Sequence, residues 1–136
     1  MTSVAPPVRH YTILDVPHFT DGDTLWVVRE WVTGDVEGVQ TLARDYAGGT
    51  RVRLTDGVAK TDRGLNTPEE GKPGYKEARL DLSNWIEAIG PKNLRLEEYG
   101  RDAFGRILGN LIVIRRPSLT VVRHMRDVRG WPAFRS

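Results

Sequence analysis

Cysteine is absent from this 136-residue sequence, so disulfide bonds and thiolate metal sites are excluded. No apolar run approaches the length of a membrane-spanning helix, and the first residues lack the apolar core of a signal peptide. We therefore expect an intracellular protein without membrane association, and secretion is not supported. The three histidines, His10, His18 and His124, lack the spacing of a zinc site. Serine-elbow, phosphate-loop and dinucleotide-binding motifs are missing too, which removes several common enzyme classes.

The residues that are present indicate one folded domain with an uneven charge. Apolar residues make up 39% of the chain and include four tryptophans, enough for a core in a domain of this size. Residues 115–136 contain six arginines and one aspartate, a formal charge of +5, whereas the whole chain carries +2. Such a segment suits either a phosphate polymer or a solvated basic surface, and composition alone does not choose between them.

Alternating apolar and β-branched residues predict five strands, at residues 12–16, 24–32, 50–54, 93–99 and 106–114. The pair Asp21-Gly22 predicts a hairpin turn between the first two strands. Residues 39–49 are ambiguous, since they fit either an extension of this hairpin or an irregular excursion. Residues 1–10, with two adjacent prolines, are expected to form a loose N-terminal arm, followed by a single domain over residues 11–136.

Two helices are predicted as well. Over residues 76–89 apolar side chains recur at three- and four-residue steps, and Gly90 and Pro91 end the pattern. Ser118 is expected to cap a second helix with an apolar stripe of Val121, Met125 and Val128. Three strands, a helix, two strands and a helix predict a mainly β (α+β) fold: a five-stranded Greek-key barrel of the OB type with two packed helices.

Four short motifs hold the residues with the greatest chemical potential. The sequence reads DGDT at 21–24, RVRL at 51–54, NTPEE at 66–70 and DAFGR at 102–106. Taken alone, each has an ordinary structural interpretation, such as a hairpin turn or the first turn of a helix. In this order, with the predicted strands and helix between them, the motifs resemble the staphylococcal nuclease (thermonuclease-like) family over roughly residues 12–128.

This resemblance implies a calcium-dependent phosphodiesterase that cleaves DNA and RNA with little sequence preference. Asp23 matches the metal-binding aspartate, Asn66 the second metal carboxylate, and Thr67 the residue that lends its backbone carbonyl to the Ca²⁺ ion. Because Asn66 replaces an acid, the cation loses one formal charge of attraction, which would weaken binding by roughly ten-fold or more at 1.4 kcal/mol per decade. Asp21, or an acid of the 55–64 loop such as Asp56 or Asp62, is an alternative source of the missing charge.

The resemblance also assigns the residues that would act on the phosphodiester. Glu69 matches the general base, which acts directly or by orienting water. Arg53 and Arg106 match two arginines that bind the scissile phosphate and stabilise the charge of the transition state. Phe104 stands where the family often has a tyrosine beside the nucleotide, so stacking is retained while a hydroxyl hydrogen bond is lost.

The loop at residues 55–64 is longer than the corresponding link in the family. Arg51 or Arg63 would then be alternatives for the phosphate role, although a strand that closes on Arg-Leu favours Arg53. A second overall interpretation follows from these departures: a nuclease-like barrel with weakened or lost catalysis that binds nucleic acid or serves as a structural module in a larger assembly. The joint presence of both arginines, Asp23 and Glu69 favours the enzyme. DNA or RNA is the expected partner in either case.

Overall fold

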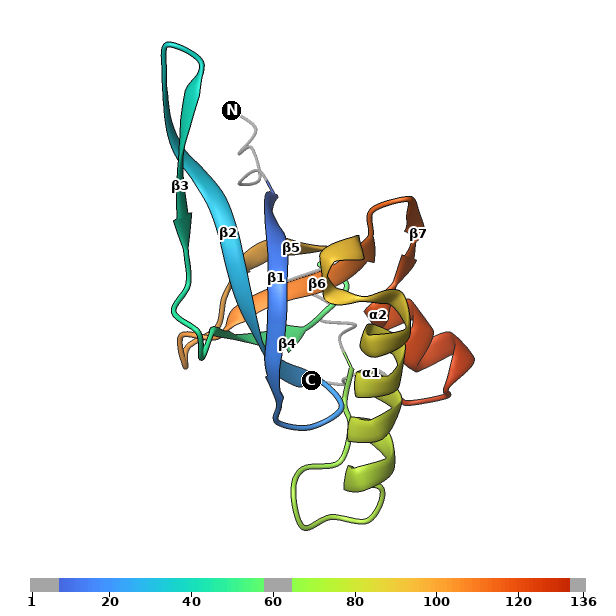
Figure 1. Ribbon diagram of the computed structural model, residues 1–136. Helices are drawn as coiled ribbons and strands as arrows, with labels where there is room; N and C mark the ends of the chain where they lie inside the picture. The colour runs from blue at the N-terminus through green and yellow to red at the C-terminus, as the bar shows by residue number, and fades with distance from the viewer. Residues whose placement is uncertain (1–7, 58–64, 133–136) are drawn as a thin grey trace, which may run out of the picture.

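A five-stranded barrel forms the body of the molecule (Figure 1). The computed structural model describes residues 8–57 and 65–132. The barrel strands are β1 Arg9–Phe19, β2 Thr24–Val36, β4 Thr50–Leu54, β5 Leu94–Arg101 and β6 Ile107–Val113. They pair in the order β1–β5–β6–β4–β2, and a β1–β2 ladder closes the ring. Only the β4–β6 pair is parallel among these strands, so the predicted OB-type Greek-key barrel is confirmed.

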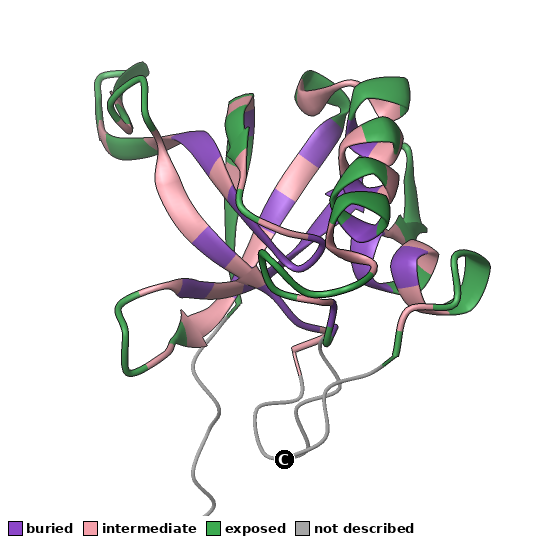
Figure 2. Ribbon diagram, turned by 90° about the horizontal axis from the view of Figure 1, so that it is seen from below, coloured by how far each residue is buried: buried purple, intermediate pink, exposed green. Residues whose placement is uncertain are grey.

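Alternation along the strands sorts the side chains into a buried interior and an outer face. On β4, Val52 and Leu54 are fully buried. The arginines that alternate with them, Arg51 and Arg53, face outward. Figure 2 shows the buried positions gathered inside the barrel. The core cluster also includes residues of the other barrel strands, namely Ile13, Leu25, Val27, Leu94, Leu96, Ile107, Leu111 and Val113. The polar side chains of β4 are thereby left on the surface, where they can build a site.

Helix α1, Tyr75–Ile89, packs its apolar face against the barrel. Ala78, Leu82 and Ile86 are buried at the spacing that the sequence predicted. The helix ends at Gly90, whose positive φ of 90° suits glycine and whose N–H donates to the Ile86 carbonyl at 2.8 Å. In the described part of the chain, no helix has both the length and the apolar character needed to cross a lipid bilayer.

The second helical region begins later than predicted. Strand β7, Arg116–Thr120, is followed by α2, Val121–Arg123, and then by a π-helical turn over residues 124–128. The N-cap is Thr120, whose hydroxyl accepts the Arg123 N–H at 3.2 Å, so the assignment of Ser118 as the cap was wrong. Val128 is 70% exposed and not part of the core, because the wider π turn breaks the regular helical period after Met125.

Residues 39–49 resolve into a strand and a connection. Strand β3, Val39–Arg44, pairs with the distal half of β2 and makes a long hairpin that projects from the barrel (Figure 1). Of the two alternatives, the hairpin extension is therefore the one observed for 39–44. β2 uses the same edge for β3 and for β4, with residues 45–49 between them.

The N-terminal segment joins the barrel earlier than expected. Strand β1 starts at Arg9, and Arg9 and His10 pair with Glu98 and Glu97 of β5, so these two residues do not belong to a loose arm. Of the rest of the expected arm, Val8 is exposed and precedes the strand, and residues 1–7 lie outside the described residues.

Candidate functional site

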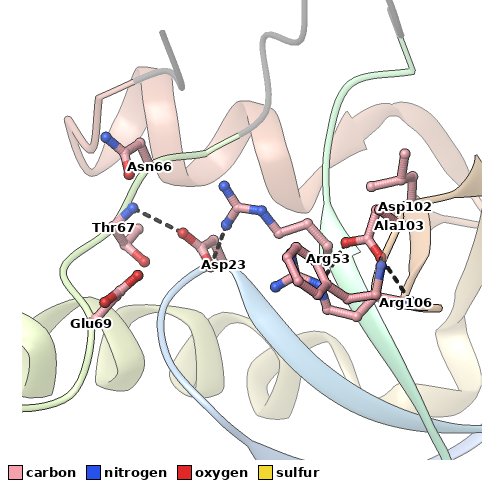
Figure 3. A pocket seen from close by; sticks show the side chains of 10 residues that line it. Asp23, Arg53, Asn66, Thr67, Glu69, Asp102, Ala103 and Arg106 are labelled. Atoms are coloured by element: carbon pink, nitrogen blue, oxygen red, sulfur yellow. Dashed lines mark hydrogen bonds and ion pairs between the residues drawn. The ribbon is translucent and has the colours of Figure 1, made fainter. Parts of the chain in front are cut away.

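A pocket of about 460 Å³ on the barrel surface brings together all seven site residues expected from the sequence (Figure 3). It is lined by Asp23, Arg53, Asn66, Thr67, Glu69, Asp102, Ala103, Phe104, Arg106 and Leu108. These residues come from the start of β2, from β4, from the segment that precedes α1, and from the β5–β6 turn with the first part of β6. Barrel closure thus assembles the pocket from four separate parts of the chain.

Asp23 is the most enclosed acid of the pocket, with 4% of its surface exposed. Its Oδ1 forms an ion pair with Nη1 of Arg53 and accepts the Thr24 hydroxyl at 3.1 Å. Its Oδ2 accepts the backbone N–H of Thr67 at 3.0 Å. Burial alone would raise the pKa of Asp23, but hydrogen bonds with Asp21 and Arg53 outweigh burial and lower it. Asp23 is therefore ionised and already has partners on both oxygens.

Asp21 holds its proton to a higher pH than its neighbour Asp23. The pKa of Asp21 is raised from 3.8 to about 7, and burial is the largest cause. The hydrogen bond with Asp23 and the negative charge of Asp23 add to this effect. Its Oδ1 also accepts the Asp23 N–H at 3.0 Å, which shapes the turn. Asp21 does not line the pocket, so it supports Asp23 from behind and does not replace the acid that is missing at Asn66.

Gly22 lets the turn pack closely against two other parts of the site. A Cβ at this position would lie 2.7 Å from the Ala78 Cβ of α1 and 2.9 Å from the Thr67 side chain. Real Cβ atoms do not come so close, so a larger residue would push the turn away from both. The glycine thereby allows Asp23 to reach the Thr67 N–H.

Arg53 joins three segments of the pocket wall. Besides its ion pair with Asp23, its Nη2 donates to the Leu65 carbonyl at 2.7 Å. The alternative Arg51 lies outside the pocket lining, and the other alternative, Arg63, lies outside the described residues. Of the two arginines on β4, Arg53 is thus the one placed to meet a phosphate in this pocket.

The β5–β6 turn carries Arg106 and Phe104, and Asp102 organises both. The Asp102 carboxylate accepts the Arg106 Nε–H at 2.6 Å and the backbone N–H groups of Phe104 and Arg106 at 2.9 Å. Burial would raise the pKa of Asp102, but the hydrogen bonds from Arg106 and the backbone lower it. Sequence analysis missed this role, although an aspartate three residues before a glycine is a turn signal that would have indicated it.

Phe104 lies beside this arginine and is largely exposed. Its ring centre is 5.5 Å from the Arg106 guanidinium carbon, and 77% of its surface is exposed. Its position at the rim of the pocket suits stacking on a base.

Glu69 contrasts with Asp23 because its carboxylate is exposed and makes no ion pair with another described residue. In Figure 3 it lies beside Thr67 on the wall of the pocket. Asn66 is exposed too, and its backbone N–H donates to the Pro132 carbonyl at 3.0 Å. The buried Thr67 hydroxyl oxygen has no hydrogen-bond partner among the described residues.

These oxygens fit a hard divalent cation, though as a weak site. Ca²⁺ prefers carboxylate, amide and carbonyl oxygens, and Asp23, Glu69, Asn66 and Thr67 offer all three kinds. The described residues contain no group of three or more acids or histidines that would hold a metal alone. The buried carboxylate is moreover neutralised by Arg53, which would compete with a cation for it.

The basic C-terminal segment contributes less charge to the surface than its composition indicates. Arg126 pairs with Asp56 at 3.2 Å, and Arg129 pairs with Asp81 at 2.6 Å. Asp56 is not among the residues that line the pocket, and Asp62 lies outside the described residues. Arg135 lies outside the described residues.

Comparison with known proteins adds no family name to this geometry. No model of a known protein family matches the chain, and no curated protein matches it either.

Proposed function

We propose that this protein is a cation-dependent nuclease of the staphylococcal nuclease type that hydrolyses phosphodiester bonds of DNA or RNA inside the cell. The observation that carries the proposal is the shared pocket, in which two arginines, a buried aspartate and an exposed glutamate converge. A phosphodiester needs cationic groups to bind its charge and a base to activate water, and this set supplies both.

The two arginines bind the phosphate in the proposed complex. Arg53 and Arg106 reach the pocket from β4 and from the β5–β6 turn, and each is held at one edge by an aspartate, Asp23 or Asp102. A guanidinium group has five N–H donors, so it can bind phosphate oxygens as well as the carboxylate that fixes its direction. Donors fixed in advance stabilise the negative charge that builds up during attack on phosphorus.

Glu69 is the base in this scheme. Its exposed carboxylate can accept a proton from a water molecule in the pocket. The water oxygen then bonds to phosphorus, the bond from phosphorus to the ester oxygen breaks, and the departing oxygen takes a proton from solvent. A Ca²⁺ ion on Asp23, Asn66 and the Thr67 carbonyl would supply further charge stabilisation to the phosphate.

The proposed contacts explain a relaxed sequence preference. Arg53 and Arg106 address phosphate oxygens, which are the same at every nucleotide. The exposed ring of Phe104 would stack on whichever base lies next to the phosphate, since every base has a flat face.

The test is plasmid cleavage by the wild-type protein and by Glu69→Gln, with millimolar Ca²⁺ and then with a chelator. We expect the variant to lose roughly 100- to 10,000-fold in kcat, the usual contribution of a general base. The melting temperature should not change, because the side chain is exposed. Glu70→Gln is the matched control, an adjacent exposed glutamate outside the pocket lining. Unchanged cleavage by Glu69→Gln would refute the assignment of the base.

A second function is favoured by one observation, the ion pair between Arg53 and Asp23. This pair occupies the carboxylate that a cation needs, and Asn66 supplies no replacement charge. The barrel would then bind nucleic acid without cutting it, alone or within an assembly. Wild-type protein that retains a labelled oligonucleotide but fails to cleave it with Ca²⁺, Mn²⁺ or Mg²⁺ would establish this function in place of the nuclease.

A further inference from the structure

The outer face of the barrel beside the pocket carries a row of side chains across three strands. Register pairs His18 of β1 with Trp26 of β2, and Trp26 with Arg51 of β4. Directly paired residues of antiparallel strands share one face of a sheet. Since Leu25 and Val27 are fully buried inside the barrel, the half-buried Trp26 between them belongs to the outer face. We call His18, Trp26 and Arg51 the outer row.

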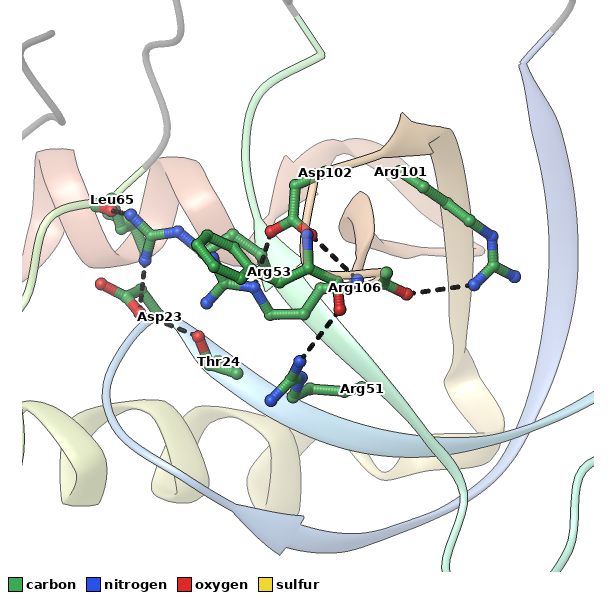
Figure 4. A network of polar contacts seen from close by, with 10 residues as sticks. Asp23, Thr24, Arg51, Arg53, Leu65, Arg101, Asp102 and Arg106 are labelled. Carbon is green, nitrogen blue, oxygen red and sulfur yellow. Dashed lines mark hydrogen bonds and ion pairs between the residues drawn. The ribbon is translucent and has the colours of Figure 1, made fainter.

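The outer row begins at the rim of the pocket. Arg51 precedes Arg53 by two residues on the same face of β4, and its Nη2 lies 3.4 Å from the Phe104 carbonyl oxygen. Figure 4 shows Arg51 beneath the turn that carries Arg106. On its other side, the Arg51 guanidinium carbon lies 5.9 Å from the Trp26 ring centre. Arg51 thus connects the phosphate-binding arginines to the indole.

The charge of Arg51 is not balanced by another described residue. Among residues 8–57 and 65–132 it makes no ion pair, and its hydrogen bond to the Phe104 carbonyl is long. The comparable exposed Arg44 on β3 has Glu30 opposite it at 3.0 Å. Arg51 thus lies between an indole and two further arginines and has no carboxylate partner among the described residues. Such an arrangement is typical of surfaces that bind a polyanion and stack its bases.

We propose that the outer row is a second nucleotide subsite, which receives the nucleotide next to the one bound in the pocket. Arg51 contacts its phosphate, and Trp26 stacks on its base, with His18 at the far end. Strand spacing of about 4.8 Å puts the two ends of the row roughly 10 Å apart, so the polymer crosses β4 toward β1. A base can stack on Trp26 only when it is unpaired, so the polymer is single-stranded. This inference rests on the proposed function, because it takes a phosphate in the pocket as its starting point.

The experiment measures binding of a fluorescent oligothymidylate of about 12 nucleotides, a length within the site sizes of OB folds. Anisotropy titrations are run in chelator, so that no cleavage occurs, at several salt concentrations. We expect Arg51→Ala to weaken binding about five-fold or more and to reduce the salt slope by roughly 0.7, the value for one single-strand phosphate contact. Trp26→Leu should weaken binding about five-fold or more, while Trp26→Phe keeps a ring and most of the affinity.

Arg44→Ala is the matched control, since it removes one exposed arginine from the neighbouring hairpin strand and should leave the affinity unchanged. Wild-type protein that cleaves plasmid with Ca²⁺ but fails to bind the oligonucleotide would overturn the subsite and leave the proposed function standing. Wild-type binding with equal affinity in Arg51→Ala and Trp26→Leu would overturn the subsite alone. An unchanged salt slope in Arg51→Ala would overturn the phosphate contact, and an equal loss of duplex binding in Trp26→Leu would overturn the single-strand assignment.

Discussion

Two arginine–aspartate pairs anchor the barrel, and their surroundings differ. Arg29 pairs with Asp45 at the base of the β2–β3 hairpin, and Arg53 pairs with Asp23 in the pocket. Burial does not separate them, because side-chain exposures are 9% and 13% in the first pair and 15% and 6% in the second. The difference lies in what covers each guanidinium group.

The pair at the hairpin base is sealed by aromatic rings. Asp45 accepts from Nε, Nη2 and the backbone N–H of Arg29 at 2.9, 3.1 and 2.9 Å. The guanidinium carbon lies 4.6 Å from the Tyr11 ring centre and 4.9 Å from that of Trp31. Burial alone would lower the pKa of Arg29, but its contacts with Asp45 raise it. Arg29 is buried, paired with Asp45 and packed beside two rings, so we infer a structural role for it.

The pair in the pocket faces open space instead. Arg53 donates to Asp23 and to a backbone carbonyl, and both side chains line a pocket of about 460 Å³. A phosphate or a cation can therefore exchange partners with this pair without unfolding its surroundings. Two ion pairs of the same chemistry therefore differ in whether packing closes around them, and only the pair that lines a pocket is open to a ligand.

Removing Arg29, the arginine of the pair at the hairpin base, should have the largest effect on stability. We expect Arg29→Ala to lower the free energy of unfolding by about 3 kcal/mol or more, because Asp45 is left buried without its partner and two rings lose their contact. Urea denaturation followed by tryptophan fluorescence measures this loss. Arg44→Ala on the same hairpin should change stability by at most about 0.5 kcal/mol. A loss in Arg29→Ala no greater than in this control would contradict the structural role.

Removing Arg53, the arginine of the pair in the pocket, should reduce activity more than stability. Arg53→Ala is expected to reduce kcat/KM for plasmid cleavage by roughly 100- to 1,000-fold, the usual effect of one transition-state donor. Stability should fall less than in Arg29→Ala, because water in the pocket can solvate Asp23. With its competitor gone, Asp23 should also bind Ca²⁺ more tightly, which calorimetry measures independently of cleavage. Weaker Ca²⁺ binding in this variant would show that Arg53 does not compete for the carboxylate.

Restoring an acid next to this pair should strengthen the cation site. Asn66→Asp adds one negative charge to the pocket and is expected to raise Ca²⁺ affinity by roughly ten-fold, which corresponds to 1.4 kcal/mol. Calorimetric titration of the variant and the wild type gives the ratio. Since Asn66 is exposed, the melting temperature in chelator should stay the same. Equal affinities would place the cation away from residue 66.

The smallest effect should come from the protonated neighbour, Asp21. Its pKa is raised by burial and by Asp23 from 3.8 to about 7, so between these values the folded protein holds a proton that the unfolded chain releases. The contribution of Asp21 to stability therefore falls as pH rises from about 4 to 7. Asp21→Asn keeps an acceptor for the Asp23 N–H and removes this fall. In chelator, the melting temperature of Asp21→Asn should exceed that of the wild type at pH 8 and should not exceed it at pH 4. Equal melting temperatures of the two proteins at both pH values would contradict the raised pKa.

Sequence patterns predicted the barrel because burial alternates along its strands and the helix repeats every three to four residues. Leu94 and Leu96, or Ala78 and Leu82, are recognisable from their neighbours alone. The four motifs likewise predicted which residues would share a pocket, since their order matched the strands that carry them. The second helix was misjudged because a π turn has no periodic signature, and its N-cap is Thr120 and not the expected Ser118.

The amino-acid sequence by itself therefore determined the order of the five barrel strands and helix α1, their buried faces and the residues that share the pocket. Only the tertiary structure decided that Arg53 pairs with Asp23, that rings close over Arg29, and that Trp26 and Arg51 stand side by side beyond the pocket. Such contacts join residues far apart in the chain. They depend on strand register and barrel closure, which are set by the packing of the whole molecule and not by any local run of residues.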